Sequence, residues 1–75
     1  MRLIAKVENI TDNIKYLGIE YDNKNLDHGV YLFYLLENDF ETCQHDGWFM
    51  NLEIAKQVAS DEYGIKENAW KEYEK

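Results

Sequence analysis

The clearest hydrophobic pattern in the chain lies at residues 30–36, where seven apolar residues run between Gly29 and a polar turn at 37–39. The run is too short to span a membrane and is rich in aromatic residues, so it predicts the central strand of a sheet. Side chains alternate across a strand, which gives two apolar faces: Val30, Leu32, Tyr34 and Leu36 on one, and Tyr31, Phe33 and Leu35 on the other. A single helix covers only one of these faces.

Three other segments have the pattern of strands. Residues 3–7 and 16–21 alternate apolar and polar side chains, and Gly18 indicates a bulge or a close backbone approach. A more polar strand is expected at 40–45, joined to the central strand by a short turn and ended by Asp46 and Gly47. The polar stretch 22–29 predicts a loop.

Residues 52–63 repeat apolar residues at helical spacing and predict the main helix. Asn51 is a suitable N-cap, and Gly64 is suited to the left-handed conformation that ends a helix, with Ile65 folding back on the last turn. A short helix is expected within 66–75, docked through Trp70. The predicted fold class is therefore α+β: a four-stranded antiparallel sheet packed on one main helix plus a short C-terminal helix, in a single domain of residues 1–75.

Charge narrows the classes of partner. Fifteen Asp and Glu against eight Lys and Arg give a net charge of −7, which disfavours nucleic acid and anionic membrane surfaces. Residues 25–55 hold six carboxylates and no Lys or Arg. Two interpretations stay open: a solubilising surface, or a face complementary to a basic protein partner. The single cysteine excludes an internal disulfide, and a reducing cytoplasm is the expected setting.

Residues 29–70 carry an aromatic strand, an Asp-x-Trp turn and a helix of the form L-E-x-A-x3-A-x2-E-Y-G-I. The positions are Asp46, Trp48, Leu52, Glu53, Ala55, Ala59, Glu62, Tyr63, Gly64, Ile65 and Trp70. In this pattern the chain resembles a group of small bacterial proteins to which no function is assigned; there Thr stands between the Asp and the Trp, where this chain has Gly47. The resemblance implies a fold and no chemistry.

Candidate catalytic chemistry is sparse. Cys43 and His45 are expected to point the same way from one strand, beside Asp46, but a zinc site needs three or four ligands and no CxxC or HExxH pattern is present. A Cys-His nucleophile lacks an oxyanion-hole or nucleophile-elbow signature. Glu62 is either a solvated flank of the helix or the partner of a donor at the sheet edge. We therefore expect no enzyme activity, no cofactor and no metal.

The function expected from the sequence is a small acidic protein-interaction module of the inhibitor, immunity or antitoxin type, binding a basic protein partner. The residues expected at the interface are Tyr31, Phe33, Glu37, Asp39, Glu41, Asp46 and Trp48. The alternative is a self-associating structural domain, and a small metal or Cys-His enzyme ranks third. Because one face of the central strand lacks a helix, a homodimer is expected, unless the N-terminal hairpin curls over that face.

Overall fold

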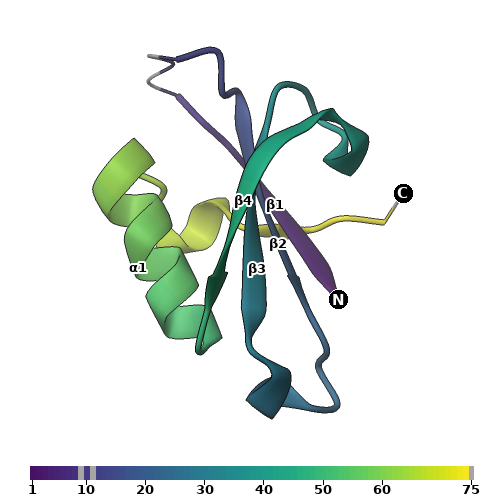
Figure 1. The fold of residues 1–75 in the computed structure, drawn as a ribbon. Helices are drawn as coiled ribbons and strands as arrows, with labels where there is room; N and C mark the ends of the chain where they lie inside the picture. Colours follow the sequence, from purple (N-terminus) through teal and green to yellow (C-terminus); the bar gives the residue numbers. More distant parts are fainter. Residues whose placement is uncertain (9, 11, 75) are drawn as a thin grey trace.

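The computed structural model describes residues 1–8, 10 and 12–74, which form one antiparallel sheet with a helix on one face (Figure 1). The strands in these residues are β1 (Arg2–Lys6), β2 (Tyr16–Tyr21), β3 (Val30–Leu35), β4 (Cys43–Phe49) and β5 (Lys71–Glu72), in the order β4-β3-β2-β1-β5. The helix is α1 (Leu52–Tyr63), and the 3-10 turns are η1 (Leu26–His28), η2 (Phe40–Thr42) and η3 (Glu67–Ala69). The predicted α+β class, central strand and main helix are confirmed.

The core lies between α1 and the facing side of the sheet. Val30, Leu32 and Tyr34 of β3 pack there, next to buried residues of β1 and β2. On the helix, Ala55 and Ala59 are fully buried, and their small side chains let α1 approach the sheet closely.

Both ends of α1 are as the sequence predicts. The Asn51 side chain accepts a hydrogen bond from the Ile54 backbone N–H at 2.9 Å. Gly64 has a φ of 68°, and its N–H and that of Ile65 donate to the last carbonyls of the helix. Ile65 then folds back and is 5% exposed.

The predicted boundaries of the last long strand were wrong. The strand begins at Cys43 instead of Phe40, and it continues through Asp46 and Gly47 to Phe49. These two residues were expected to end it. They are tolerated because β4 is an edge strand, which bonds to a neighbour along one side only.

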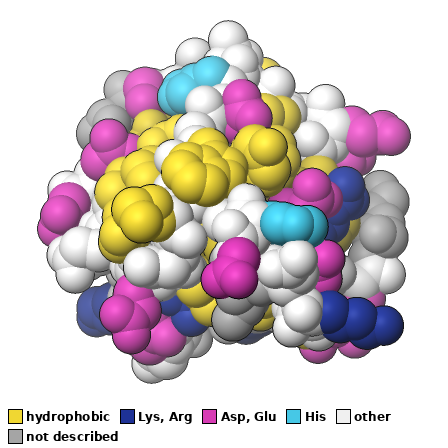
Figure 2. Space-filling view, turned by 60° about the horizontal axis from the view of Figure 1, so that its bottom comes forward, with side chains coloured by type: hydrophobic (Ala, Val, Ile, Leu, Met, Phe, Trp, Pro, Cys, Tyr) yellow, Lys and Arg dark blue, Asp and Glu magenta, His cyan; other side chains and the backbone are white. Residues whose placement is uncertain are grey.

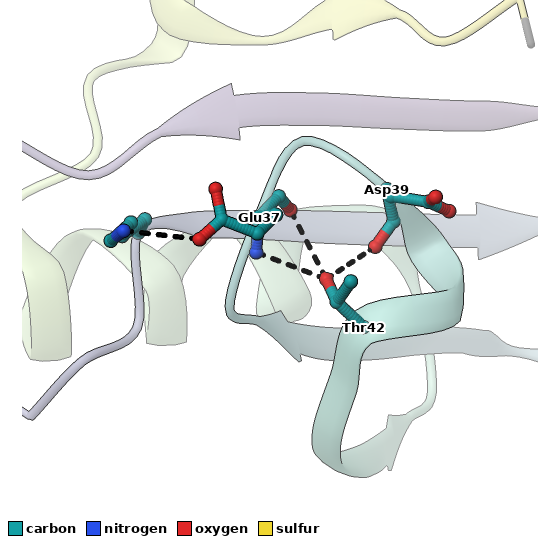
Figure 3. A network of polar contacts seen from close by, with 4 residues as sticks. Glu37, Asp39 and Thr42 are labelled. Carbon is teal, nitrogen blue, oxygen red and sulfur yellow. Dashed lines mark hydrogen bonds and ion pairs between the residues drawn. The ribbon is translucent and has the colours of Figure 1, made fainter.

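The turn before β4 is longer than predicted because side chains stabilise it. Thr42 Oγ1 accepts a hydrogen bond from the Glu37 N–H at 3.0 Å and donates to the Asp39 carbonyl at 2.7 Å (Figure 3). The Asp39 carboxylate accepts from the Glu41 N–H at 2.9 Å. These bonds hold the chain in η2 until Cys43 enters the sheet.

The predicted C-terminal helix was also wrong. After η3 the chain forms β5, a fifth strand that pairs with the outer edge of β1, and the Tyr73 N–H donates to the Arg2 carbonyl at 2.8 Å. Edge pairing satisfies backbone groups of β1, whereas a short charged helix gains little stability in water. Trp70 packs against the core, as expected.

The face of the sheet opposite α1, called the open face below, was expected to need a second copy or the N-terminal hairpin to cover it. η2 folds over part of it, on the side away from α1 in Figure 1. The Phe40 ring lies against Gly18, where an added Cβ would be 2.5 Å from Phe40 Cζ. At Gly18 the sequence predicted a bulge or a close backbone approach. The structure shows the close approach of an aromatic side chain, and β2 keeps a regular register with both of its neighbours.

Candidate functional site

Tyr31 and Trp48 form an exposed aromatic pair on the open face, at the end that carries η1. The two residues are opposite each other in the β3–β4 register, so their side chains project from the same face. Their side chains are 45% and 52% exposed, although large aromatic rings are usually well buried. Figure 2 views this end of the molecule and shows hydrophobic side chains gathered in a band with carboxylates along its borders.

Trp48 is held in place despite its exposure. Its indole Nε1 donates to the His28 carbonyl at 3.1 Å. One side of the ring lies against Gly29, where an added Cβ would be 2.4 Å from the ring. Gly29 also has a φ of 79°, a conformation that L side chains rarely adopt. The ring is therefore fixed in one orientation, with little freedom to lose when a partner binds.

A row of rings continues from this pair along the open face. Tyr31 and Phe33 have centroids 6.2 Å apart, Phe33 and Phe40 are 5.5 Å apart, and Phe40 and Tyr73 are 4.8 Å apart. The Arg2 guanidinium lies 4.7 Å from the Phe40 ring centroid and forms an ion pair with Glu20 at 2.6 Å. One end of the row is thus covered and the Tyr31–Trp48 end is not.

The acidic residues predicted at the interface lie in three separate places. Asp46 lies opposite Phe33 in register, beside the aromatic pair. Asp39 and Glu41 lie around η2, in a shallow pocket that also contains Arg2. Glu37 forms an ion pair with Lys15 at 3.0 Å (Figure 3). Six of the seven predicted residues therefore lie on the open face or border it. The seventh, Glu37, lies in the turn and is paired with Lys15.

Cys43 and His45 do not point the same way, contrary to expectation. A bulge at Gln44 shifts the register, so that Cys43 is opposite Leu35 and His45 is opposite Tyr34, whose side chains project from opposite faces. Partial desolvation of the thiol, together with the charge of Asp46, raises the pKa of Cys43, which disfavours the nucleophilic thiolate. Among the described residues, no group of three or more His, Cys, Asp and Glu side chains is arranged to hold a metal.

A second cluster of polar side chains lies on the side of the sheet that faces α1, and the sequence pattern did not predict that these residues are neighbours. Tyr34, His45, Asp12, Glu62 and Tyr63 line a shallow pocket of about 220 Å³ at the C-terminal end of α1. Its residues come from β3, β4, α1 and the β1–β2 connection. The sequence predicted Glu62 to be either a solvated flank of the helix or the partner of a donor at the sheet edge. It accepts instead from the Tyr34 hydroxyl of the inner strand β3, at 2.8 Å.

The two tyrosines of this pocket donate to carboxylates. Tyr63 donates to Asp12 Oδ2 at 2.7 Å, as Tyr34 does to Glu62 Oε1. Burial, followed by the hydrogen bond to Asp12 and its charge, raises the pKa of Tyr63 to about 12. Burial and the bond to Glu62 raise the pKa of Tyr34 further. Both phenols are therefore neutral hydrogen-bond donors at physiological pH.

No helix in the described part of the chain has both the length and the apolar character needed to cross a membrane. Searches against protein-family models, curated proteins and solved structures give no match to this chain. The resemblance of residues 29–70 to a group of small bacterial proteins therefore stays a prediction.

Proposed function

We propose that this chain is a small acidic protein-interaction module without enzyme activity, and that its open face binds a basic protein partner. The observation that carries the proposal is the Tyr31–Trp48 pair, half exposed and held by the rest of the fold. Tyr and Trp are enriched among the residues that dominate binding energy at protein interfaces. Their fixed rings bury large areas with little loss of side-chain entropy.

The charges around the aromatic pair favour a cationic partner. An open cleft of about 540 Å³ adjoins Tyr31 and is lined in part by Asp22, Glu20 and Arg2. Arg2 is already paired with Glu20. Within the described residues, Asp22 and Asp46 form no ion pair with Lys or Arg, so their charge is available to a partner. Such rim charges mainly steer association and exclude wrong partners.

Self-association is the second candidate, and the position of β4 favours it. This strand lies at the edge of the sheet and carries Trp48 on the open face. Two copies related by a two-fold axis would either pack their open faces together and bury both aromatic pairs, or pair their two exposed β4 edges. In either case we place the protein in a reducing cytoplasm, where its exposed Cys43 stays a free thiol.

Affinity capture from native cells, followed by titration of the purified partner, tests the proposal. A stoichiometric basic partner is expected to bind the native chain and to lose about tenfold or more in affinity with Trp48→Ala or Tyr31→Ala. Ile54→Ala is the matched control, since Ile54 is 40% exposed on α1, away from the open face.

Two results would contradict this function. One is a captured partner whose affinity is unchanged by both aromatic substitutions. The other is a partner that Ile54→Ala weakens as much as Trp48→Ala does, because binding would then lie on the helix.

A further inference from the structure

We propose that the pocket lined by Asp12, Tyr34, His45, Glu62 and Tyr63, called the tyrosine pocket below, binds a single guanidinium group, such as the end of an arginine side chain. The pocket lies on the side of the sheet that α1 covers, so this site does not rest on the function proposed for the open face. Four separate segments contribute side chains to this shallow pocket.

Charge is the first argument. In the described part of the chain, neither Asp12 nor Glu62 forms an ion pair with Lys or Arg, and no cationic Lys or Arg lines the pocket. Two carboxylates thus face one small concave space. An Arg side chain is the residue best matched to carboxylates, since its planar fork can donate several hydrogen bonds at once.

The carboxylates of Asp12 and Glu62 can each accept more hydrogen bonds than they do within the chain. Glu62 Oε1 accepts from Tyr34, and no described residue donates to Glu62 Oε2. Asp12 accepts from Tyr63 through Oδ2 and from the Ile14 N–H through Oδ1 at 3.3 Å. An ionised carboxylate has about four lone-pair sites, so each can accept further bonds. The tyrosines meanwhile fix both carboxylates, which reduces the entropy lost on binding.

Three aromatic rings line the tyrosine pocket and pack on one another. His45 stacks on Tyr34 with centroids 4.2 Å apart and an interplanar angle of 17°. Tyr63 lies 5.9 Å from Tyr34 and is tilted by 53°. A guanidinium group stacks on aromatic faces and is more weakly hydrated than an ammonium group. The combination of flat rings and carboxylates therefore favours arginine over lysine.

Size limits the ligand class. The pocket volume of about 220 Å³ is below the roughly 300–1,000 Å³ of pockets that enclose drug-sized ligands. A planar cationic group fits such a space, whereas a nucleotide does not.

An NMR titration with Nα-acetyl-arginine amide tests the site, with Nα-acetyl-citrulline amide as the uncharged isostere and Nα-acetyl-lysine amide as the second cation. The arginine compound is expected to bind with millimolar affinity and to shift the amide signals of His45 and Glu62. The lysine compound should bind more weakly, and the citrulline compound should leave these signals unchanged.

Glu62→Gln and Glu53→Gln are a matched pair of variants on one helix. Gln keeps an acceptor for the Tyr34 hydroxyl, so the first variant should fold, and it should bind the arginine compound at least tenfold more weakly. Glu53 lies outside the tyrosine pocket, and its variant should bind as the native chain does. Equal binding of citrulline or lysine, arginine shifts confined to the open face, or unchanged binding in Glu62→Gln would overturn the proposal.

Discussion

At the scale of single residues, Gly18 decides how the open face is covered. It lies in the middle of β2, and the absence of a side chain there lets the Phe40 ring approach the sheet. Phe40 is 9% exposed as a result. The sequence indicates a special role for Gly18, but not which ring fills the space, because Phe40 is 22 positions away and its approach depends on η2.

Gly18→Ala is expected to lower the free energy of unfolding by about 1–3 kcal/mol, since the new methyl group must displace the Phe40 ring. Urea denaturation measures the change. Gly47→Ala is the control, because its added Cβ would be 3.4 Å from the nearest atom of Phe49, and it should change stability by less than about 0.5 kcal/mol.

A double variant makes the Gly18 prediction specific. If the loss comes from the contact with the ring, Gly18→Ala should cost much less in a Phe40→Ala background than in the native chain. An equal cost in both backgrounds would show that the ring is not the cause.

The phenols of the tyrosine pocket predict how stability depends on pH. Their pKa values are raised in the folded protein above the ordinary value of 10.0, to about 12 for Tyr63. The stabilisation they provide is complete below pH 10, where the phenol is neutral in both states, and is lost as pH rises through the folded pKa. The free energy of unfolding should therefore fall between pH 10 and 12.

Tyr34→Phe combined with Tyr63→Phe should make this fall smaller and should remove the last phenols to ionise in a titration of tyrosinate absorbance. Tyr31→Phe is the control, because Tyr31 lies on the open face outside this pocket. A double variant that loses stability above pH 10 as steeply as the native chain would contradict the assignment.

At the scale of elements, the boundaries that could be predicted from the sequence are those set by residues close to them in the chain. The helix boundaries at Leu52 and Tyr63 were predictable because Asn51 and Gly64 act on backbone groups one turn away. The start of β4 was missed because the Thr42 hydroxyl extends the turn, accepting from the Glu37 N–H and donating to the Asp39 carbonyl. The hydrophobic pattern does not reveal such bonds.

β5 was missed for a different reason. Its sequence is charged and has no strand pattern, and it becomes a strand only because β1 offers an unpaired edge. The Tyr73 ring then covers Phe40 on the open face, with their centroids 4.8 Å apart. A pairing between the two ends of the chain is a tertiary event that residues 66–75 alone do not encode.

Tyr73→Ala should therefore weaken both the edge pairing and the cover of Phe40. The expected loss is about 1–2 kcal/mol in the free energy of unfolding, with faster hydrogen exchange of the amide at position 73. Glu74→Ala changes the exposed neighbour and should stay within about 0.5 kcal/mol of the native chain. Unchanged exchange at position 73 in the Tyr73 variant would contradict this account of β5.

At the scale of the whole molecule, the sequence was enough to predict which aromatic residues lie on the open face, but not the tyrosine pocket. The alternation of β3 was enough to place Tyr31 and Phe33 on the face away from α1. The tyrosine pocket joins Asp12 to Tyr63, 51 positions apart, and no local pattern brings such residues together. The acidic middle of the chain is likewise divided by the fold, since Glu37 pairs with Lys15 while Asp46 lies beside the aromatic row.

The salt dependence of association distinguishes the two candidate functions, because salt should strengthen a homodimer and weaken a complex with a basic partner. Each chain carries a net charge of −7, so two copies repel each other, and salt screens this repulsion. A complex with a basic partner depends instead on attraction, which the same salt weakens.

For the homodimer we therefore expect the mass from light scattering to rise from 9.0 kDa toward twice that value as salt increases, and Trp48→Ser to abolish the rise. A mass that stays near one chain at micromolar concentration and at every salt strength would exclude the homodimer. Association that weakens with salt, and that is seen only with a basic protein present, would support the heteromeric complex in place of the homodimer.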